Sequence, residues 1–131
     1  MLFRSSSDRR INALSGAVID AAMTVHRELG PGLLESVYER CLAIELQQRR
    51  IEFVRQREVP TVYKDIPIEA PLRLDFIIVD TIILEIKAVE KLIPLFEAQL
   101  LTYLRLTRIR LGLLINFNTP LLKDGIRRIA H

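Results

Sequence analysis

Two short hydrophobic runs with charges inside them decide the fold: Arg73-Leu74-Asp75-Phe76-Ile77-Ile78-Val79 and Ile82-Ile83-Leu84-Glu85-Ile86-Lys87-Ala88. Their length and β-branched content are typical of strands. Residues 80–81 separate them as a short hairpin connection. Side chains alternate faces along a strand, so Glu85 and Lys87 share one face and Asp75 shares a face with its neighbours two positions away. If the strands pair as a hairpin, Asp75 lies close to Glu85 and Lys87.

Charges inside apolar strands need a physical reason, because a buried unpaired charge is costly. Two carboxylates at one point repel each other, and one is pushed towards its neutral form. A divalent cation removes that conflict, and Mg²⁺ prefers oxygen ligands while leaving positions for water and phosphate. Asp75 and Glu85 supply the carboxylates, and the backbone carbonyl of Ile86 adds a neutral oxygen. The expected ion is Mg²⁺, with Mn²⁺ as the alternative.

Lys87 has several chemical roles open to it beside such an ion. The metal would polarise a phosphoryl oxygen and lower the pKa of a bound water. Lys87 would then orient or deprotonate that water, or stabilise charge in the transition state, since burial readily lowers the pKa of a lysine. The competing interpretation is a structural salt bridge from Lys87 to Asp75 or Glu85, because a Glu-x-Lys pattern is frequent by chance.

Helices surround the two strands in the predicted layout. Hydrophobic periodicity predicts long helices on the N-terminal side, which Gly30-Pro31-Gly32 separates. The resulting α+β (α/β) order favours a mixed central sheet flanked by helices and preceded by two N-terminal helices. The predicted helices cover residues 8–29, 33–50, 94–106 and 121–129. Further strands are predicted at residues 53–59, 61–63 and 111–117. Pro67 and Pro71 bracket a turn or an edge segment, and residues 62–72 are expected to form an edge strand and its connection.

Two helical positions are candidates for completing the site. Glu35 begins the second helix, and Gln99 and Tyr103 are four residues apart on the helix after Lys87. A helix beside the hairpin would aim Gln99 at the site and place Tyr103 behind it. The simpler explanations are that Glu35 is an acid favoured in a first turn and that Gln99 faces solvent.

Composition sets limits on the other possibilities. The chain has 131 residues, half of them hydrophobic, which fits one domain over residues 11–131 after a flexible tail at residues 1–10. Cys41 is the only cysteine, so an internal disulfide is excluded, and core packing in a reducing cytoplasm is expected. His26 and His131 have no zinc-type spacing. Neither a signal peptide nor a membrane span is predicted.

Basic residues are concentrated towards the C-terminal side. The net charge is +3, and a positive surface is compatible with phosphate backbones as well as with ordinary solvation. Both interpretations stay open. The candidate nucleic-acid-binding residues are Arg105, Arg108, Arg110, Lys123, Arg127 and Arg128.

Several segments resemble the GxxExxY family of small bacterial and archaeal proteins. They are Gly32-Leu33-Leu34-Glu35-Ser36-Val37-Tyr38, Leu74-Asp75-Phe76, Leu84-Glu85-Ile86-Lys87-Ala88-Val89-Glu90, Glu97-Ala98-Gln99-Leu100-Leu101-Thr102-Tyr103-Leu104, Gly112-Leu113-Leu114-Ile115-Asn116-Phe117 and Leu122-Lys123-Asp124-Gly125-Ile126. The resemblance extends over residues 11–129, nearly the whole chain, in the expected order.

That family is grouped with the PD-(D/E)XK nuclease superfamily, so the resemblance implies a restriction-endonuclease-like core with a Mg²⁺ site. It implies catalytic roles for Glu35, Asp75, Glu85, Lys87 and Gln99, with Glu35 as a further candidate metal ligand. Gln99-x-x-x-Tyr103 resembles an element of RecB-like nucleases. The residues expected to support the site are Tyr38, Arg73 and Tyr103.

Three hypotheses follow for function. The first is a Mg²⁺-dependent nuclease acting on DNA or RNA. The second is a catalytically silent module of the same fold that binds nucleic acid or assembles with protein, and the long apolar faces of the two N-terminal helices are a candidate homodimer surface. The third is a structural protein whose charged cluster is only a salt bridge.

Overall fold

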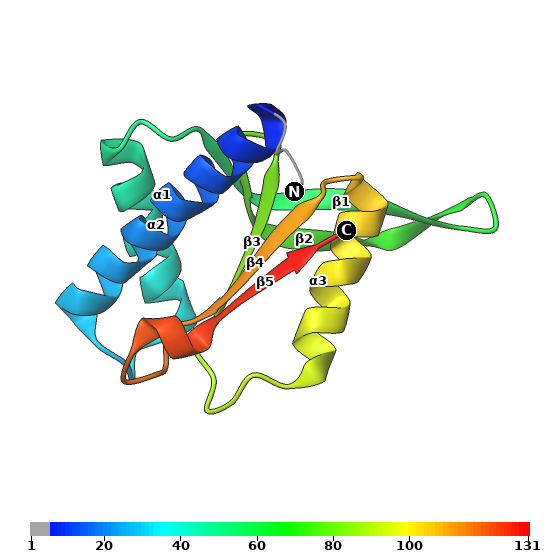
Figure 1. Ribbon diagram of the computed structural model, residues 1–131. Helices are drawn as coiled ribbons and strands as arrows, with labels where there is room; N and C mark the ends of the chain where they lie inside the picture. Colours follow the sequence, from blue (N-terminus) through cyan, green and yellow to red (C-terminus); the bar gives the residue numbers. More distant parts are fainter. Residues whose placement is uncertain (1–5) are drawn as a thin grey trace.

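A computed structural model describes residues 6–131 of the chain (Figure 1). The predicted tail lies partly outside these residues, and residues 6–10 form the first turns of a helix rather than an extended tail. No helix among the described residues is long and apolar enough to cross a membrane. The elements are α1 (Ser6–Leu29), α2 (Glu35–Gln48), β1 (Phe53–Tyr63), β2 (Ile66–Ile78), β3 (Ile82–Lys87), α3 (Pro94–Thr107), β4 (Leu111–Asn116), the 3₁₀ helix η1 (Leu122–Gly125) and β5 (Ile126–Ala130).

One mixed sheet contains the five strands of residues 6–131 in the order β1-β2-β3-β4-β5. Neighbouring strands are antiparallel except for β3 and β4, which are parallel. A parallel pair needs a crossover, and α3 provides it. Pro94 lies at the N-terminus of α3, where a missing N–H costs no helical hydrogen bond.

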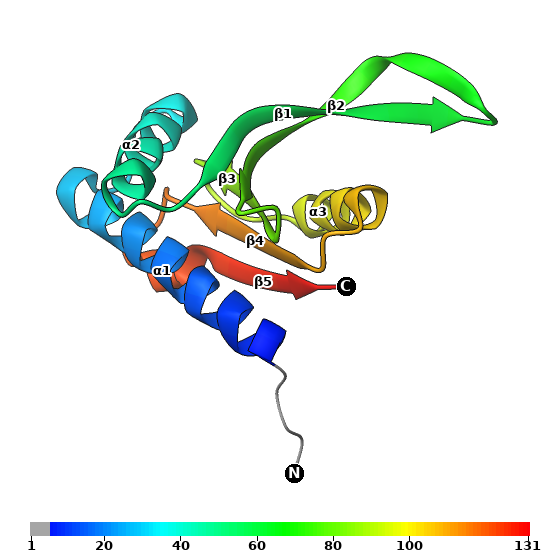
Figure 2. The same ribbon diagram turned by 90° about the horizontal axis from the view of Figure 1, so that it is seen from above.

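Helices cover both faces of the sheet (Figure 2). The larger core cluster joins α1 and α2 to one face, and a smaller cluster joins α3 to the other. Every residue of β4 is buried, as expected for a strand covered on both sides. The predicted mixed sheet flanked by helices is therefore confirmed.

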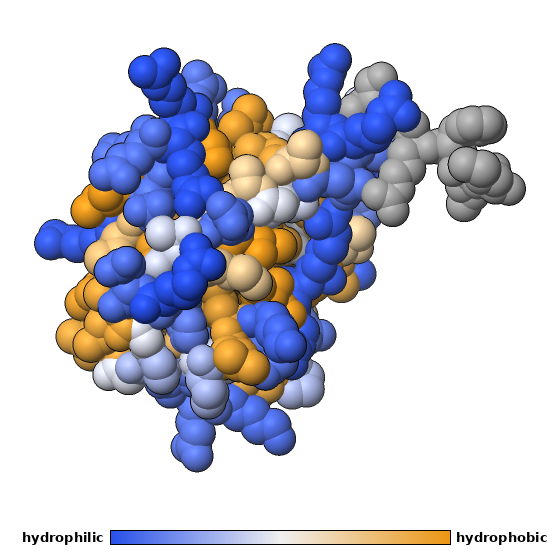
Figure 3. All heavy atoms as spheres, turned by 60° about the vertical axis from the view of Figure 1, so that its left-hand side comes forward, coloured by the Kyte–Doolittle hydropathy of each residue, from blue (hydrophilic) through white to orange (hydrophobic). Residues whose placement is uncertain are grey.

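The apolar stripes of α1 and α2 pack against the sheet. Val18, Ala22 and Val25 of α1 and Leu42 and Leu46 of α2 are buried in the larger core, and Cys41 packs against the same cluster. The outward surface of this side mixes charged and apolar residues (Figure 3). These stripes are thus occupied within the chain, and the structure gives no support for using them as a homodimer surface.

The C-terminal segment differs from its prediction. Residues 121–129 were expected to form a closing helix, but only η1 is helical and residues 126–130 are strand β5. The edge of β4 offers a full row of backbone partners, and Leu111 to Ile115 pair with residues 126–130. Ladder pairing with an open edge outweighs the weak helical periodicity of so short a segment.

The segment around the prolines is an edge strand, which was one of the two predicted alternatives. β1 continues through Pro60, where two separate strands were predicted, with a register shift between Val59 and Thr61, and Pro67 and Pro71 lie inside β2. The turn is formed instead by Lys64 and Asp65, both at positive φ (48° and 64°). β3 pairs only with residues 76–78 of β2, so the outer part of the hairpin is an edge on both sides, where proline is tolerated. It projects from the body as a two-stranded ribbon (Figure 2).

Candidate functional site

The site begins where β2 and β3 separate. Their backbone pairing runs from Ile78–Ile82 to Phe76–Leu84, which places Asp75 opposite Glu85 at the next position. At this position, hydrogen bonds to the two carboxylates take the place of the backbone hydrogen bonds between the strands. The N–H of Asp75 donates to Oε1 of Glu85 (3.2 Å), and the N–H of Ile86 donates to Oδ2 of Asp75 (2.8 Å). Each carboxylate is therefore held by a backbone N–H of the opposite strand.

Strict alternation fails along β2 at this point. Leu74 and Ile77 both belong to the core beneath α3, whereas Phe76 and Ile78 belong to the core beneath α1 and α2. On the other side of β2, Arg55 pairs with Phe76 and Arg57 with Leu74, so Gln56 lies opposite Asp75, and its φ is +50°. The prediction that Arg73, Asp75 and Ile77 share a face by simple alternation was therefore wrong in its premise.

The two carboxyl groups are strongly coupled by burial. Only 8% of the surface of Glu85 is exposed. Burial, followed by the charge of Asp75, raises the pKa of Glu85 to about 9. Burial also raises the pKa of Asp75, against the lowering effect of its hydrogen bonds from Ile86 and Glu85. Burial and the neighbouring acid therefore both oppose the charged forms of these two carboxyl groups.

Lys87 ends β3 on the same face as Glu85. Its Nζ lies 4.5 Å from the centroid of the Phe96 ring of α3, a cation–π contact. No ion pair within 4.0 Å joins Lys87 to Asp75 or Glu85. The structure thus does not show the salt bridge that was the competing interpretation of this cluster.

A buried amide fixes the chain just beyond Lys87. Oδ1 of Asn116 accepts the N–H of Val89 (3.0 Å), and its Nδ2 donates to the carbonyl of Val89 (2.9 Å). The N–H of Phe117 donates to the carbonyl of Lys87 (2.9 Å). Asn116 is 2% exposed. The end of β4 and the residue after it therefore fix the backbone of Lys87 and Val89. Asn116 was not among the predicted site residues, although an amide at the end of an apolar strand was a usable signal.

Glu35 is the first residue of α2 and approaches the carboxylate pair. Burial raises its pKa, Asp75 raises it further, and Lys87 lowers it. Glu39 lies one turn later and also raises the pKa values of Glu35 and Asp75. Glu39 was not among the predicted residues, yet its spacing of four from Glu35 put it on the same helix face.

Glu39 is engaged by β1, because its carboxylate pairs with Arg55 (2.9 Å) and accepts a hydrogen bond from Gln56. Among residues 7–131, no three His, Cys, Asp or Glu side chains gather closely enough to hold one ion. Asp75 and Glu85 remain the predicted metal ligands of this cluster. The place of Glu35 as a third ligand stays a prediction, as does the backbone carbonyl of Ile86.

Tyr38 fixes the loop that precedes Glu35. Its hydroxyl donates to the carbonyl of Gly30 (2.6 Å) and accepts the N–H of Leu33 (3.2 Å). Its ring stacks on Phe117 with the centroids 4.7 Å apart. Tyr38 thus links the start of α2 to the strand that holds Lys87.

The remaining predicted residues lie in different surroundings. Tyr103 is partly buried, and burial, followed by the charges of Glu85 and Asp75, raises its pKa. Gln99 is exposed on α3, one turn from Phe96 and one turn from Tyr103. Arg73 pairs with Glu58 (3.0 Å) on the projecting ribbon instead of with Asp75.

The six basic candidates do not form one surface. Arg128 donates to Ser15 and Asn12 of α1 (2.9 and 2.6 Å), whereas Arg127 pairs with Glu97 of α3 (3.6 Å). These helices cover opposite faces of the sheet (Figure 2). The others are spread over the end of α3, the start of β4 and η1: Arg105, Arg108, Arg110 and Lys123. A single nucleic-acid track through all six is therefore not present.

In a comparison with known proteins, the family model described as the PD-(D/E)XK nuclease superfamily matches residues 12–129, a range that contains every residue of the site. No curated protein and no solved structure matches the chain.

Proposed function

The chain belongs to the PD-(D/E)XK nuclease superfamily, and from this premise we propose that it is a divalent-metal-dependent phosphodiesterase that cleaves DNA or RNA. One observation carries the proposal. Asp75 and Glu85 face each other across two strands, each fixed by a backbone N–H, with Lys87 two residues further along β3. The expected ion is Mg²⁺, and the finer resemblance to the GxxExxY family supports the same assignment.

The donor set fits a hard divalent cation. One oxygen of each carboxylate accepts a backbone hydrogen bond, and burial beside Asp75 raises the pKa of Glu85 to about 9. A bound cation would favour the charged form of both carboxyl groups at once. Asp75 and Glu85 would hold the ion, which when bound polarises a phosphoryl oxygen and acidifies a water.

The chain's own residues supply the other requirements. Lys87 brings a positive charge beside the pair, where it stabilises the additional negative charge of a phosphodiester under attack. Its ammonium rests on the Phe96 ring, which limits its freedom. Tyr103 keeps its hydroxyl proton because its pKa is raised, so it offers a hydrogen-bond donor to a phosphate oxygen. Glu35 approaches from α2 and adds negative charge that favours a cation.

The direct test is cleavage by the purified protein of single- and double-stranded DNA and RNA with Mg²⁺ or Mn²⁺. We expect cleavage that chelation abolishes, and a loss of at least about 100-fold in Asp75→Asn and in Lys87→Met. Lys91→Met is the matched control, because Lys91 is exposed, and it should keep full activity. Cleavage that survives in Asp75→Asn and Lys87→Met would refute the assignment.

A catalytically silent nucleic-acid-binding module is the second candidate. It is favoured because, among residues 7–131, no three His, Cys, Asp or Glu side chains lie close enough together to hold one metal ion. This candidate predicts binding that weakens with salt, as phosphate contacts require, without cleavage and without heat of Mn²⁺ binding in calorimetry. A Mn²⁺ binding signal that disappears in Asp75→Asn would argue against it.

A further inference from the structure

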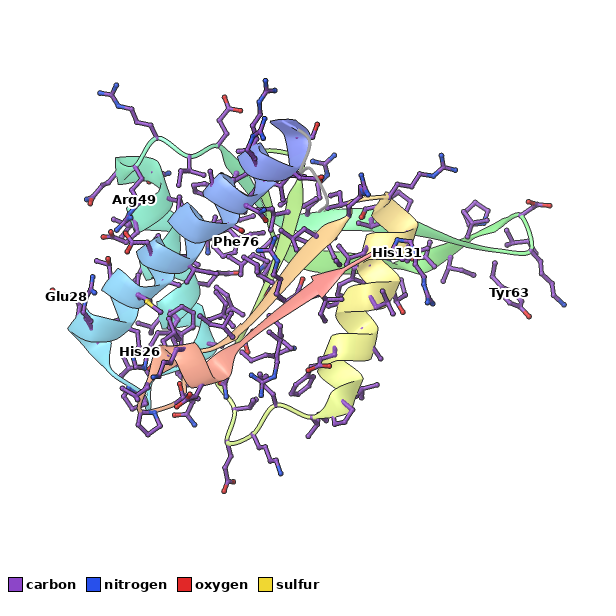
Figure 4. All side chains as sticks on the ribbon, in the orientation of Figure 1. His26, Glu28, Arg49, Tyr63, Phe76 and His131 are labelled. Atoms are coloured by element: carbon purple, nitrogen blue, oxygen red, sulfur yellow. The ribbon has the colours of Figure 1, made fainter. Side chains whose placement is uncertain are left out.

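The projecting ribbon carries an exposed apolar face. We define the arm as residues 57–73, the outer part of the β1–β2 hairpin. Tyr63 pairs with Ile66 and Thr61 with Ile68, so these four side chains share one face. Tyr63 and Ile66 are each 62% exposed and Ile68 is 41% exposed, and Tyr63 lies near the tip, away from the body (Figure 4). A lone two-stranded ribbon is only marginally stable in water, so a covering partner is expected.

A hollow of about 380 Å³ lies at the base of the same arm. Its apolar lining is Val59, Pro60, Ile77 and Ile109. Val59, Thr61 and Tyr63 alternate along β1, so the hollow and the apolar face of the arm lie on one side of the strand. Arg57, Glu58 and Asp80 contribute charged groups to the lining.

The charges of the arm argue for protein rather than nucleic acid as its partner. Three basic residues are balanced by three acidic ones, so the arm has no net charge (3 − 3 = 0) whereas the chain carries +3. Phosphate backbones select positive surfaces. The six residues are Arg57, Lys64, Arg73, Glu58, Asp65 and Glu69.

We propose that the partner is a second copy of this chain, with the two arms packed antiparallel about a two-fold axis. Lys64 is seven positions after Arg57, a span of roughly 23 Å at about 3.3 Å per residue. Antiparallel overlap of two such arms brings each tip to the base of the other. The apolar side chains of the tip then enter the partner's hollow, and the contact is self-complementary as two-fold symmetry demands.

Charge at the two ends fits this arrangement. The tip carries Lys64 and Asp65, and the lining of the hollow contains Asp80 and Arg57. In the antiparallel dimer Lys64 of one copy faces the acidic Asp80 side of the other, and Asp65 faces Arg57. A parallel arrangement would instead bring each tip against an identical tip, without the hollow.

The test compares two faces of the same arm in the full chain. Ile66→Asp places a charge on the apolar face, and Val62→Asp places it on the opposite face at a similar exposure (62% and 59%). Sedimentation equilibrium should show a wild-type dimer, a dissociation constant raised at least tenfold in Ile66→Asp, and little change in Val62→Asp. Circular dichroism checks that both variants are folded.

A second measurement locates the contact. A photo-crosslinking benzoylphenylalanine in place of Tyr63 should yield covalent dimers whose linked peptides contain residues of the hollow, such as Ile109 or Pro60. A wild-type chain that stays monomeric at 200 micromolar (about 3 mg/mL), equal effects of the two Asp variants, or crosslinks only between tips would each overturn the proposal. So would reduced nucleic-acid affinity in Ile66→Asp without a change of oligomeric state.

Discussion

At the scale of single residues, the fold buries two acids side by side, and their pKa values are both raised. Asp75 and Glu85 each accept a backbone N–H from the facing strand, which orients the carboxylates more firmly than side-chain packing alone. The arrangement is unfavourable for the metal-free protein, since burial opposes the charged form of both acids and raises both pKa values. Sites kept at such a cost are typical of function rather than of stability.

Glu85→Gln should therefore stabilise the metal-free protein at pH 8. The pKa of Glu85 is raised to about 9 in the fold from an ordinary 4.5, so the unfolded chain releases this proton first. The stability of the wild type then falls as pH rises between those two values. The amide cannot ionise, and it keeps an oxygen for the N–H of Asp75.

Thermal unfolding in EDTA measures the effect. The gain of Glu85→Gln over the wild type should be small at pH 5 and reach at least about 1 kcal/mol at pH 8, on the order of 4 °C. Glu90→Gln, at an exposed position, should show no such trend. With Mn²⁺ the order should reverse, because the ion stabilises only the wild type. A loss of stability in Glu85→Gln at pH 8 without metal would contradict the account.

At the scale of elements, the site depends on two attachments outside the strands that carry the acids. Tyr38 holds the loop before α2, and Asn116 holds the segment after β3. The stacking of Tyr38 on Phe117 and the hydrogen bond from Phe117 to Lys87 join the two. Glu35 and Lys87, which belong to different elements, are thereby fixed relative to each other.

Tyr38→Phe removes the hydroxyl and keeps the ring stacked on Phe117. The carbonyl of Gly30 and the N–H of Leu33 lose their partner, which should cost about 1–3 kcal/mol of unfolding free energy. Hydrogen exchange should rise in residues 30–35 and stay unchanged in β4. Tyr63→Phe, on the exposed arm, should change stability by less than about 0.5 kcal/mol. Equal stability of the two variants would show that Tyr38 acts through its ring alone.

Asn116→Ala tests the second attachment. It removes both hydrogen bonds to Val89 from a side chain that is 2% exposed, so a loss of about 2–4 kcal/mol is expected in chemical denaturation. Asn118→Ala, two residues later, serves as the control. A wild-type denaturation midpoint in Asn116→Ala would mean that the segment after Lys87 is held by other contacts.

At the scale of the whole molecule, α3 lies close against β4, and a glycine permits it. A Cβ on Gly112 would lie 2.8–2.9 Å from side-chain carbons of the buried Leu100. Without that close approach, α3 could not bring Phe96 and Tyr103 to the face that carries Glu85 and Lys87. The shape of the site therefore depends on how closely the crossover helix α3 packs against β4.

Gly112→Ala should destabilise the fold by about 1–3 kcal/mol through overpacking. Gly16→Ala is the matched control, because nothing lies within 4 Å of a Cβ at Gly16 of α1, and alanine there should stabilise the helix by about 0.5–1 kcal/mol. Urea denaturation of both variants gives the comparison. A neutral or stabilising Gly112→Ala would show that Leu100 can move aside freely.

Elements with a long regular period were predictable from the sequence, and contacts decided by non-local competition were not. The stripes of α1 and the buried run of β4 were visible because each repeats over several residues. The pairing of residues 126–130 depends on an edge that exists only once the sheet has formed. The continuation of β1 through Pro60 likewise depends on the position of β1 as an edge strand, which has no neighbouring strand on its outer side within residues 6–131. The local sequence around the proline does not show this.

Some features of the site were also predictable from the sequence, and others were not. The meeting of Asp75 with Glu85 followed from a hairpin of known length, so it was within reach of the sequence. The break in alternation at Asp75 lies opposite Gln56 of a third strand, a residue whose φ is positive, and the acid Glu39 matters only because α2 is placed beside that strand. Neither is encoded near the residues it affects.

The measurement that tests the central claim most directly is the anomalous diffraction of crystals soaked in Mn²⁺. The account predicts one Mn²⁺ per chain, bound directly by an oxygen of Asp75 and an oxygen of Glu85, and no ion in crystals of Asp75→Asn. An ion bound elsewhere with the two carboxyl groups still hydrogen-bonded to each other, or no ion at concentrations that support nucleases, would contradict it.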